Sequence, residues 1–152
     1  MTRSVKHATF SLERRYPVAP ARVFAAWSDP SAKARWFGAD VGHELDFRIG
    51  GREINRGRHT GDGPLLTFEA TYHDIVDGER IAYAGTLSFD GTLATISITT
   101  VEFVPDGEGT RLVLTEQGTF LDGAEEPAWR EQGTGEWLDK LDAELRRAQP
   151  SR

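Results

Sequence analysis

The residues of this sequence best suited to bind a small molecule are aromatic, because flat rings bury apolar area and can leave a polar tip free. For any one of them, filling the core of the protein is the more frequent role. For the set as a whole, a pocket for a planar apolar ligand remains an alternative. The candidates for lining such a pocket are Trp27, Trp36, Phe37, Phe47, Tyr72, Tyr83, Phe103, Trp129, Trp137 and, from an apolar stripe near the C-terminus, Leu141.

Two charged residues fall on otherwise apolar faces of predicted strands. Glu116 continues the side formed by Leu112 and Leu114, and Arg14 continues the side of Leu12. A buried charge needs a partner, a water-filled cavity or a position at the end of a strand. Glu116 is therefore a candidate for orienting the polar group of a ligand, and Arg14 is a second one.

Other kinds of chemistry find little support. The absence of cysteine excludes disulfides, thiolate nucleophiles and cysteine zinc sites. No GxSxG, Walker or GxGxxG motif is present, so we predict neither a hydrolase nor a nucleotide site, and no cofactor. The histidines lack HxH and HExxH spacing, and we predict that they lie at the surface or in turns and bind no metal: His7, His43, His59 and His73.

Asp46 and Arg48 share one face of a predicted strand, next to the pair Gly50 and Gly51. Opposite charges at this spacing can pair with each other or across to a neighbouring strand. We predict that they form an ion pair that fixes the bend of the chain, rather than a catalytic site.

The composition limits the class of protein. A chain of 152 residues fits a single domain, predicted over residues 1–152, with room for a sizeable core. Asp and Glu outnumber Lys and Arg by 24 to 18, giving a net charge of -6, which argues against binding nucleic acid. No apolar run approaches the roughly 20 residues that cross a bilayer, and the start lacks the apolar part of a signal peptide. We therefore predict a cytoplasmic protein that does not insert into a membrane.

Hydrophobic periodicity predicts a strand, two short helices, six more strands and a long helix. Pro20 begins the first short helix, which has an apolar stripe of Val23, Phe24 and Trp27, and the second covers residues 32–37. Alternating or β-branched segments separated by turn residues predict strands. The predicted strands are residues 9–16, 43–49, 52–59, 65–76, 80–89, 94–104 and 110–118.

The C-terminal segment 125–148 predicts an amphipathic helix. Its apolar stripe has the three- and four-residue spacing of a helix face that must be buried, and it consists of Leu138, Leu141, Leu145 and Ala148. No second long helix is predicted, so the receiving surface must be a sheet.

Gly133 and Gly135 interrupt the pattern of this helix, and each costs about 1 kcal/mol relative to alanine. Two interpretations stand side by side. Either the glycines open space beneath a continuous helix, or residues 125–132 form a separate turn and the long helix begins near residue 134.

Several segments keep the order and spacing of a known family. They are residues 15–37 (RYPVAPARVFAAWSDPSAKARWF), 46–51 (DFRIGG) and 109–118 (GTRLVLTEQG), followed by Gly133, Leu138 and Leu141. With these motifs the chain resembles the bacterial branch of the activator of heat-shock protein 90 ATPase homologue family, within the START-like or SRPBCC superfamily. The resemblance implies an α+β helix-grip fold, in which a curved seven-stranded antiparallel sheet wraps around a long C-terminal helix. It also implies two short helices between the first two strands and an apolar cavity between helix and sheet.

Three functions follow from these observations. The first is binding of a hydrophobic or aromatic small molecule in the cavity. The second, which the superfamily contains, is an enzyme of the polyketide cyclase or aromatase kind that uses Tyr72, Tyr83, Glu116 or Arg14 as acid or base. The third, suggested by the family name, is activation of a chaperone ATPase. A homodimer through an edge strand or the short helices is a further possibility.

Overall fold

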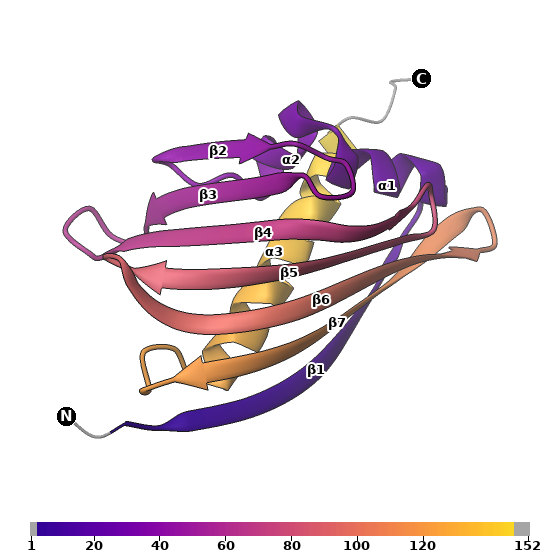
Figure 1. Cartoon of the computed structure of the whole chain (residues 1–152). Helices are drawn as coiled ribbons and strands as arrows, with labels where there is room; N and C mark the ends of the chain where they lie inside the picture. Colours follow the sequence, from indigo (N-terminus) through magenta and orange to yellow (C-terminus); the bar gives the residue numbers. More distant parts are fainter. Residues whose placement is uncertain (1–2, 148–152) are drawn as a thin grey trace.

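In this computed structural model, residues 3–147 are described. Seven antiparallel strands form one curved sheet in the order β1-β7-β6-β5-β4-β3-β2, and α3 crosses its concave face (Figure 1). This architecture confirms the predicted α+β helix-grip fold. The elements are β1 (Val5–Tyr16), α1 (Pro20–Ser28), α2 (Pro30–Trp36), β2 (Gly42–Leu45), β3 (Arg52–Arg58), β4 (Leu65–Val76), β5 (Arg80–Phe89), β6 (Thr92–Asp106), β7 (Gly109–Leu121) and α3 (Pro127–Arg147).

The two short helices form for the reasons that their sequence suggests. Pro20 opens α1, where its missing N–H costs nothing, and the apolar stripe of this helix is buried. The Asp29 carboxylate caps α2 by accepting a hydrogen bond of 3.1 Å from the Ala32 backbone N–H. Both helices lie at the end of the sheet where the C-terminal half of α3 arrives (Figure 1).

The prediction of a strand over residues 43–49 is wrong for its second half. β2 ends at Leu45, and the chain then bends through residues 46–51. The left-handed backbone of Gly50, with φ of +83°, permits this bend, and hydrogen bonds from Gly50 and to Gly51 tie it to Tyr72 of β4. The predicted ion pair is confirmed, because Arg48 Nε donates to Asp46 Oδ2 at 2.9 Å.

α3 is continuous through both glycines, so the interpretation with a separate turn over residues 125–132 is wrong. Its stripe of Leu138, Leu141 and Leu145 is fully buried, whereas Ala148 lies outside the described residues. Tyr16 of β1 anchors the middle of α3 by donating to the Leu138 carbonyl oxygen at 3.1 Å. None of the helices in residues 3–147 is long and apolar enough to span a membrane.

A row of small residues crosses the concave face of the sheet beneath α3. Ala70, Gly85, Ser97 and Gly118 are successive cross-strand partners from β4 to β7. Aromatic rings lean over the two glycines, since a Cβ atom on Gly85 would lie 3.0 Å from the Phe68 ring. A Cβ atom on Gly118 would likewise lie 2.8 Å from the ring of Phe120. The glycines are therefore required for the rings to pack against the sheet.

Candidate ligand-binding site

A buried ionic cluster joins α2 to the first strands of the sheet, and we call it the Glu53 cluster. It consists of Lys33 from α2, His43 from β2, Glu53 from β3 and Tyr72 from β4. Glu53 Oε1 accepts from Lys33 Nζ at 3.0 Å and from Tyr72 Oη at 2.6 Å. Glu53 Oε2 lies 2.7 Å from His43 Nε2. An ionised carboxylate can only accept, so this nitrogen carries the hydrogen.

The Glu53 cluster is ionised despite its burial. The side chains of Lys33 and Glu53 are 2% and 1% exposed. Burial raises the pKa of Glu53, but the Lys33 ammonium and three hydrogen bonds outweigh this effect and lower the pKa to about 2. Burial lowers the pKa of Lys33, and the Glu53 carboxylate opposes that shift. Neutralising Lys33 would leave the carboxylate without a balancing charge, so the pair stays charged.

Aromatic rings form a closed circuit of contacts that includes Tyr72 of this cluster. Each ring contacts the next with centroids between 4.9 and 6.5 Å apart, mostly edge to face. The Lys33 ammonium lies 4.6 to 5.5 Å from the centroids of three of them, which adds cation–π attraction. In order, the circuit is Phe37, Phe68, Tyr83, Tyr72, Phe47, Phe24, Phe103, Trp27 and Trp36.

A second buried polar group lies under the N-terminal half of α3, and we call it the Arg130 cluster. The Arg130 guanidinium donates to Glu125 Oε1 at 3.1 Å and to Ser97 Oγ at 3.2 Å. Its Nε lies 2.8 Å from Glu116 Oε2, within ion-pair distance. Thr99 Oγ1 donates to the other Glu116 oxygen at 3.0 Å, and Thr95 Oγ1 donates to Glu125 at 2.6 Å.

Glu116 is the strained member of this cluster. Burial raises its pKa, and Arg130 and Thr99 reduce the increase without cancelling it. Glu116 Oε2 is buried and contacts Arg130 Nε at 2.8 Å as an ion pair, without a well-aligned hydrogen bond. The site therefore holds a carboxylate oxygen with unused capacity to accept.

Four partly exposed side chains join the two clusters, and we call them the aromatic edge: Phe37, Phe68, Tyr83 and Trp137. Phe37 is 5.0 Å from Trp137 and 5.7 Å from Phe68, and Phe68 is 6.5 Å from Tyr83, measured between ring centroids. One turn before Trp137 on α3, a Cβ atom on Gly133 would meet no atom within 4 Å. Open space therefore adjoins the aromatic edge on the helix side.

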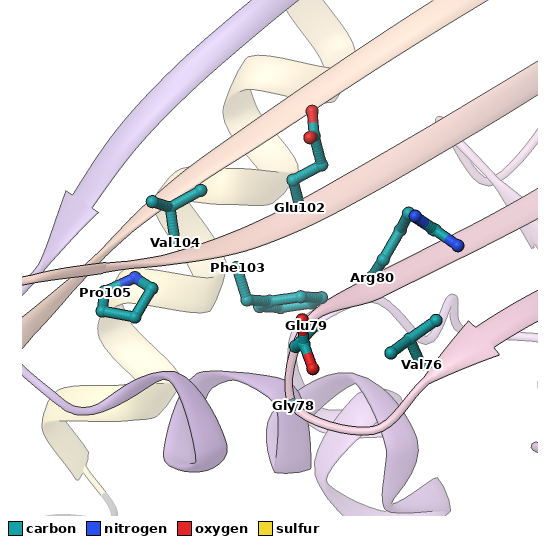
Figure 2. A pocket seen from close by; sticks show the side chains of 8 residues that line it. All are labelled: Val76, Gly78, Glu79, Arg80, Glu102, Phe103, Val104 and Pro105. Carbon is teal, nitrogen blue, oxygen red and sulfur yellow. The ribbon is translucent and has the colours of Figure 1, made fainter.

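Two pockets of the described chain lie away from this interior. One, of about 370 Å³, is an open hollow where the turn between β4 and β5 meets β6, lined by residues that include Val76, Arg80 and Phe103 (Figure 2). The other, of about 250 Å³, lies on the sheet around His7, Ile96 and Gln117. Neither pocket is the apolar cavity between helix and sheet that the family resemblance implies, because buried aromatic and leucine side chains pack together there.

The structure brings the predicted site residues together in one interior. The buried members are Trp27, Trp36, Tyr72, Phe103, Glu116 and Leu141, and the partly buried ones are Phe37, Phe47, Tyr83 and Trp137.

The predictions for two individual side chains are wrong. Trp129 is 63% exposed, because it lies in the first turn of α3 on the side facing solvent. His43 is not a surface histidine, because the pairing of β2 with β3 turns its ring inward onto Glu53, and its side chain is 5% exposed.

Of the four residues considered for acid–base chemistry, two converge. Tyr83, Thr99 and Glu116 are neighbours across β5, β6 and β7, so Tyr83 and Glu116 lie on one wall. Tyr72 is committed to Glu53. Arg14 lies 3.5 Å from Asp139 on the outer side of α3, away from the two clusters.

The sequence reasoning missed Lys33, Glu53, Glu125 and Arg130. Lys33 and Glu53 are 20 positions apart, and nothing local marks them as partners. The usable signal was in β3, where Glu53, Asn55 and Gly57 share one face and Ile54 is the single apolar side chain of the strand. These three turn out to face the interior.

Comparison with known proteins places the chain in a family. Residues 17–146 match the family model described as activator of Hsp90 ATPase homolog 1-like protein. The chain belongs to this family. The match confirms the resemblance drawn from the sequence motifs, and it covers both short helices, β2 to β7 and nearly all of α3.

Solved structures of bacterial proteins share the fold of this family member. Mll3558 from Rhizobium loti is 42% identical over 93% of this chain and 99% of its own, with a TM-score of 0.86. A protein from Rhizobium leguminosarum is 42% identical over 97% and 99%, with a TM-score of 0.91. CV1439 from Chromobacterium violaceum is 30% identical over 90% and 96%, with a TM-score of 0.75. No curated protein matched the chain.

Proposed function

We propose that this protein binds a small molecule with a flat apolar part, in the space between α3 and the concave face of the sheet. The observation that carries the proposal is the aromatic edge, a group of partly exposed rings beside the open space at Gly133. Aromatic side chains left partly exposed on a concave surface are typical of ligand sites. The Arg130 cluster supplies polar groups at the inner end.

The affinity would come mainly from apolar burial. Each 100 Å² of apolar surface removed from water contributes about 2.5 kcal/mol, before the cost of association is subtracted. Entry requires rings such as Phe68 and Trp137 to change rotamer, because side chains occupy much of the interior. Rotamer changes of partly exposed side chains are fast compared with binding.

Isothermal titration calorimetry with 2-naphthylmethanol, a neutral flat probe, tests the proposal. The wild type should bind the probe, and Gly133→Leu should abolish binding because the new side chain fills the space beside the aromatic edge. The matched control is Gln132→Leu, which adds the same side chain at the neighbouring exposed position of α3. Equal binding by the wild type and Gly133→Leu would contradict this location for the site.

A second proposal, an enzyme of the polyketide cyclase or aromatase kind, draws support from the convergence of Tyr83 and Glu116. A carboxyl group with a raised pKa beside a tyrosine suits proton transfer next to a carbonyl group. Deuterium exchange into 2-tetralone, followed by NMR in D₂O, tests this activity. Exchange faster than in buffer, lost in Glu116→Gln, would support it, and exchange at the buffer rate would count against it.

Activation of a chaperone ATPase stays a prediction drawn from the family resemblance. A pull-down against the host's homologue of heat-shock protein 90 tests it, and retention of that homologue above a bead-only control is the expected sign of such an interaction.

A further inference from the structure

The Oε2 oxygen of Glu116 marks a position for a ligand group. The Glu116 side chain is 6% exposed, and its Oε2 atom lacks a hydrogen-bond partner. The aligned N–H groups of Arg130 are already used by Glu125 and Ser97. A donor arriving at Glu116 Oε2 would share this oxygen with the Arg130 Nε atom 2.8 Å away, and a carboxylate oxygen has lone pairs for both.

The charge around this oxygen is unbalanced. The charged groups that act on Glu116 are Arg130 and Glu125, so two carboxylates share one guanidinium. With both carboxylates ionised, one negative charge remains in a buried place, and a cation that reached it would remove the imbalance. An anion would meet two carboxylates and be repelled.

The neighbours of Glu116 also suit an organic cation. Glu116 and Tyr83 flank Thr99 across the sheet, and the Tyr83 ring belongs to the aromatic edge. Aromatic faces attract ammonium groups, and the same rings would hold the flat part of a ligand. The carboxylate and the rings are thus placed for two ends of one molecule.

Resting on the function proposed above, we infer that the ligand is an aromatic amine, whose ammonium group donates to Glu116 Oε2 while its ring lies against the aromatic edge. The inference names the chemical class of ligand, which the family description does not.

Three naphthalene probes that differ only in the group they carry test the inference by calorimetry at pH 7. They are 2-naphthylmethylamine, 2-naphthylmethanol and 2-naphthylacetate. A charge-assisted hydrogen bond should make the amine bind at least about tenfold more tightly than the alcohol, with the anion weakest. Binding of all three with equal affinity, or preference for the anion, would overturn the inference alone. Failure of all three to bind would overturn the proposed function itself.

The variant Glu116→Gln tests whether the Glu116 carboxylate causes the preference for the amine probe. The amine should lose about tenfold more affinity than the alcohol, because the amide oxygen of glutamine still accepts from a hydroxyl group but no longer offers a charge to the ammonium group. Glu131→Gln, at an exposed position of α3, should change neither. An equal loss for both probes would assign Glu116 a purely structural role and overturn the inference. If Glu116→Gln does not fold, as far-UV circular dichroism would reveal, the comparison of the three probes on the wild type still supports or overturns the inference.

Discussion

Replacing Lys33 with methionine should destabilise the protein by about 3 kcal/mol at pH 7. The substitution keeps most of the side-chain volume but leaves the Glu53 carboxylate, 1% exposed, with only Tyr72 and His43 as donors. The magnitude follows from Glu53 itself. Its pKa lies at about 2 rather than 4.5, and this difference corresponds to a net stabilisation of about 3 kcal/mol that remains after the cost of burial. Among the groups that lower the pKa, the Lys33 charge contributes most.

Urea unfolding followed by circular dichroism measures the effect. Urea unfolding repeated at a series of pH values gives a second test of the contribution of Glu53 to stability. Because the folded pKa of Glu53 is depressed, its contribution is present in full above pH 4.5 and is lost as the pH falls from 4.5 towards 2. Lys33→Met should lose less stability over this interval, since burial then holds the pKa of Glu53 higher.

The double variant Lys33→Met/Glu53→Gln separates the charges of the pair from the hydrogen bonds around it. Removing both charges should recover part of the stability lost in Lys33→Met, because no uncompensated charge stays buried and the glutamine oxygen still accepts from Tyr72. The matched control is Arg48→Met, which breaks an exposed ion pair and should cost less than about 0.5 kcal/mol. A Lys33→Met protein within about 0.5 kcal/mol of the wild type would refute the reasoning.

The remaining predictions concern α3 and the link between α2 and β2. Gly133→Ala should stabilise the protein by about 0.5–1 kcal/mol in thermal unfolding, because it removes a helix-interior glycine where a Cβ atom meets open space. Gly135→Ala should gain less, since its Cβ atom would lie 3.2 Å from Arg14 Nη2, and an equal gain would contradict the contact. Asn55→Leu should cost about 2 kcal/mol in urea unfolding, because Asn55 accepts from the Ala39 N–H at 2.8 Å and donates to the Phe37 carbonyl at 2.9 Å. A cost below about 0.5 kcal/mol would show that water replaces both bonds.

Hydrophobic periodicity in the sequence was sufficient to predict the order of strands and helices, because one face of every long strand packs inward. Strand ends were less visible: β1 begins at Val5 and β7 continues to Leu121, beyond the alternating parts of both segments. The bend after Leu45 was missed because Phe47 and Ile49 continue an alternating pattern.

The aromatic part of the candidate site could be predicted from residue type, and the polar part could not. Lys33, His43 and Tyr72 reach Glu53 from positions 20, 10 and 19 residues away along the chain. Their meeting depends on how α2 docks against β2 and β3, which no local pattern encodes. Glu116 was found because its carboxylate interrupts an apolar face, whereas Arg130, its partner, looks like an ordinary surface residue of an amphipathic helix.

The phenyl rings of Phe68 and Phe120 lie over Gly85 and Gly118, so the side-chain torsion angles of these two residues affect the volume between α3 and the sheet. Each ring lies within 3.0 Å of the position that a Cβ atom would take if the glycine beneath it were any other residue. The two rings cover a row of small residues that crosses four strands, from Ala70 to Gly118. Exchanging Phe68 and Phe120 for smaller residues would therefore widen the space between α3 and the sheet while the strand pairing stays the same.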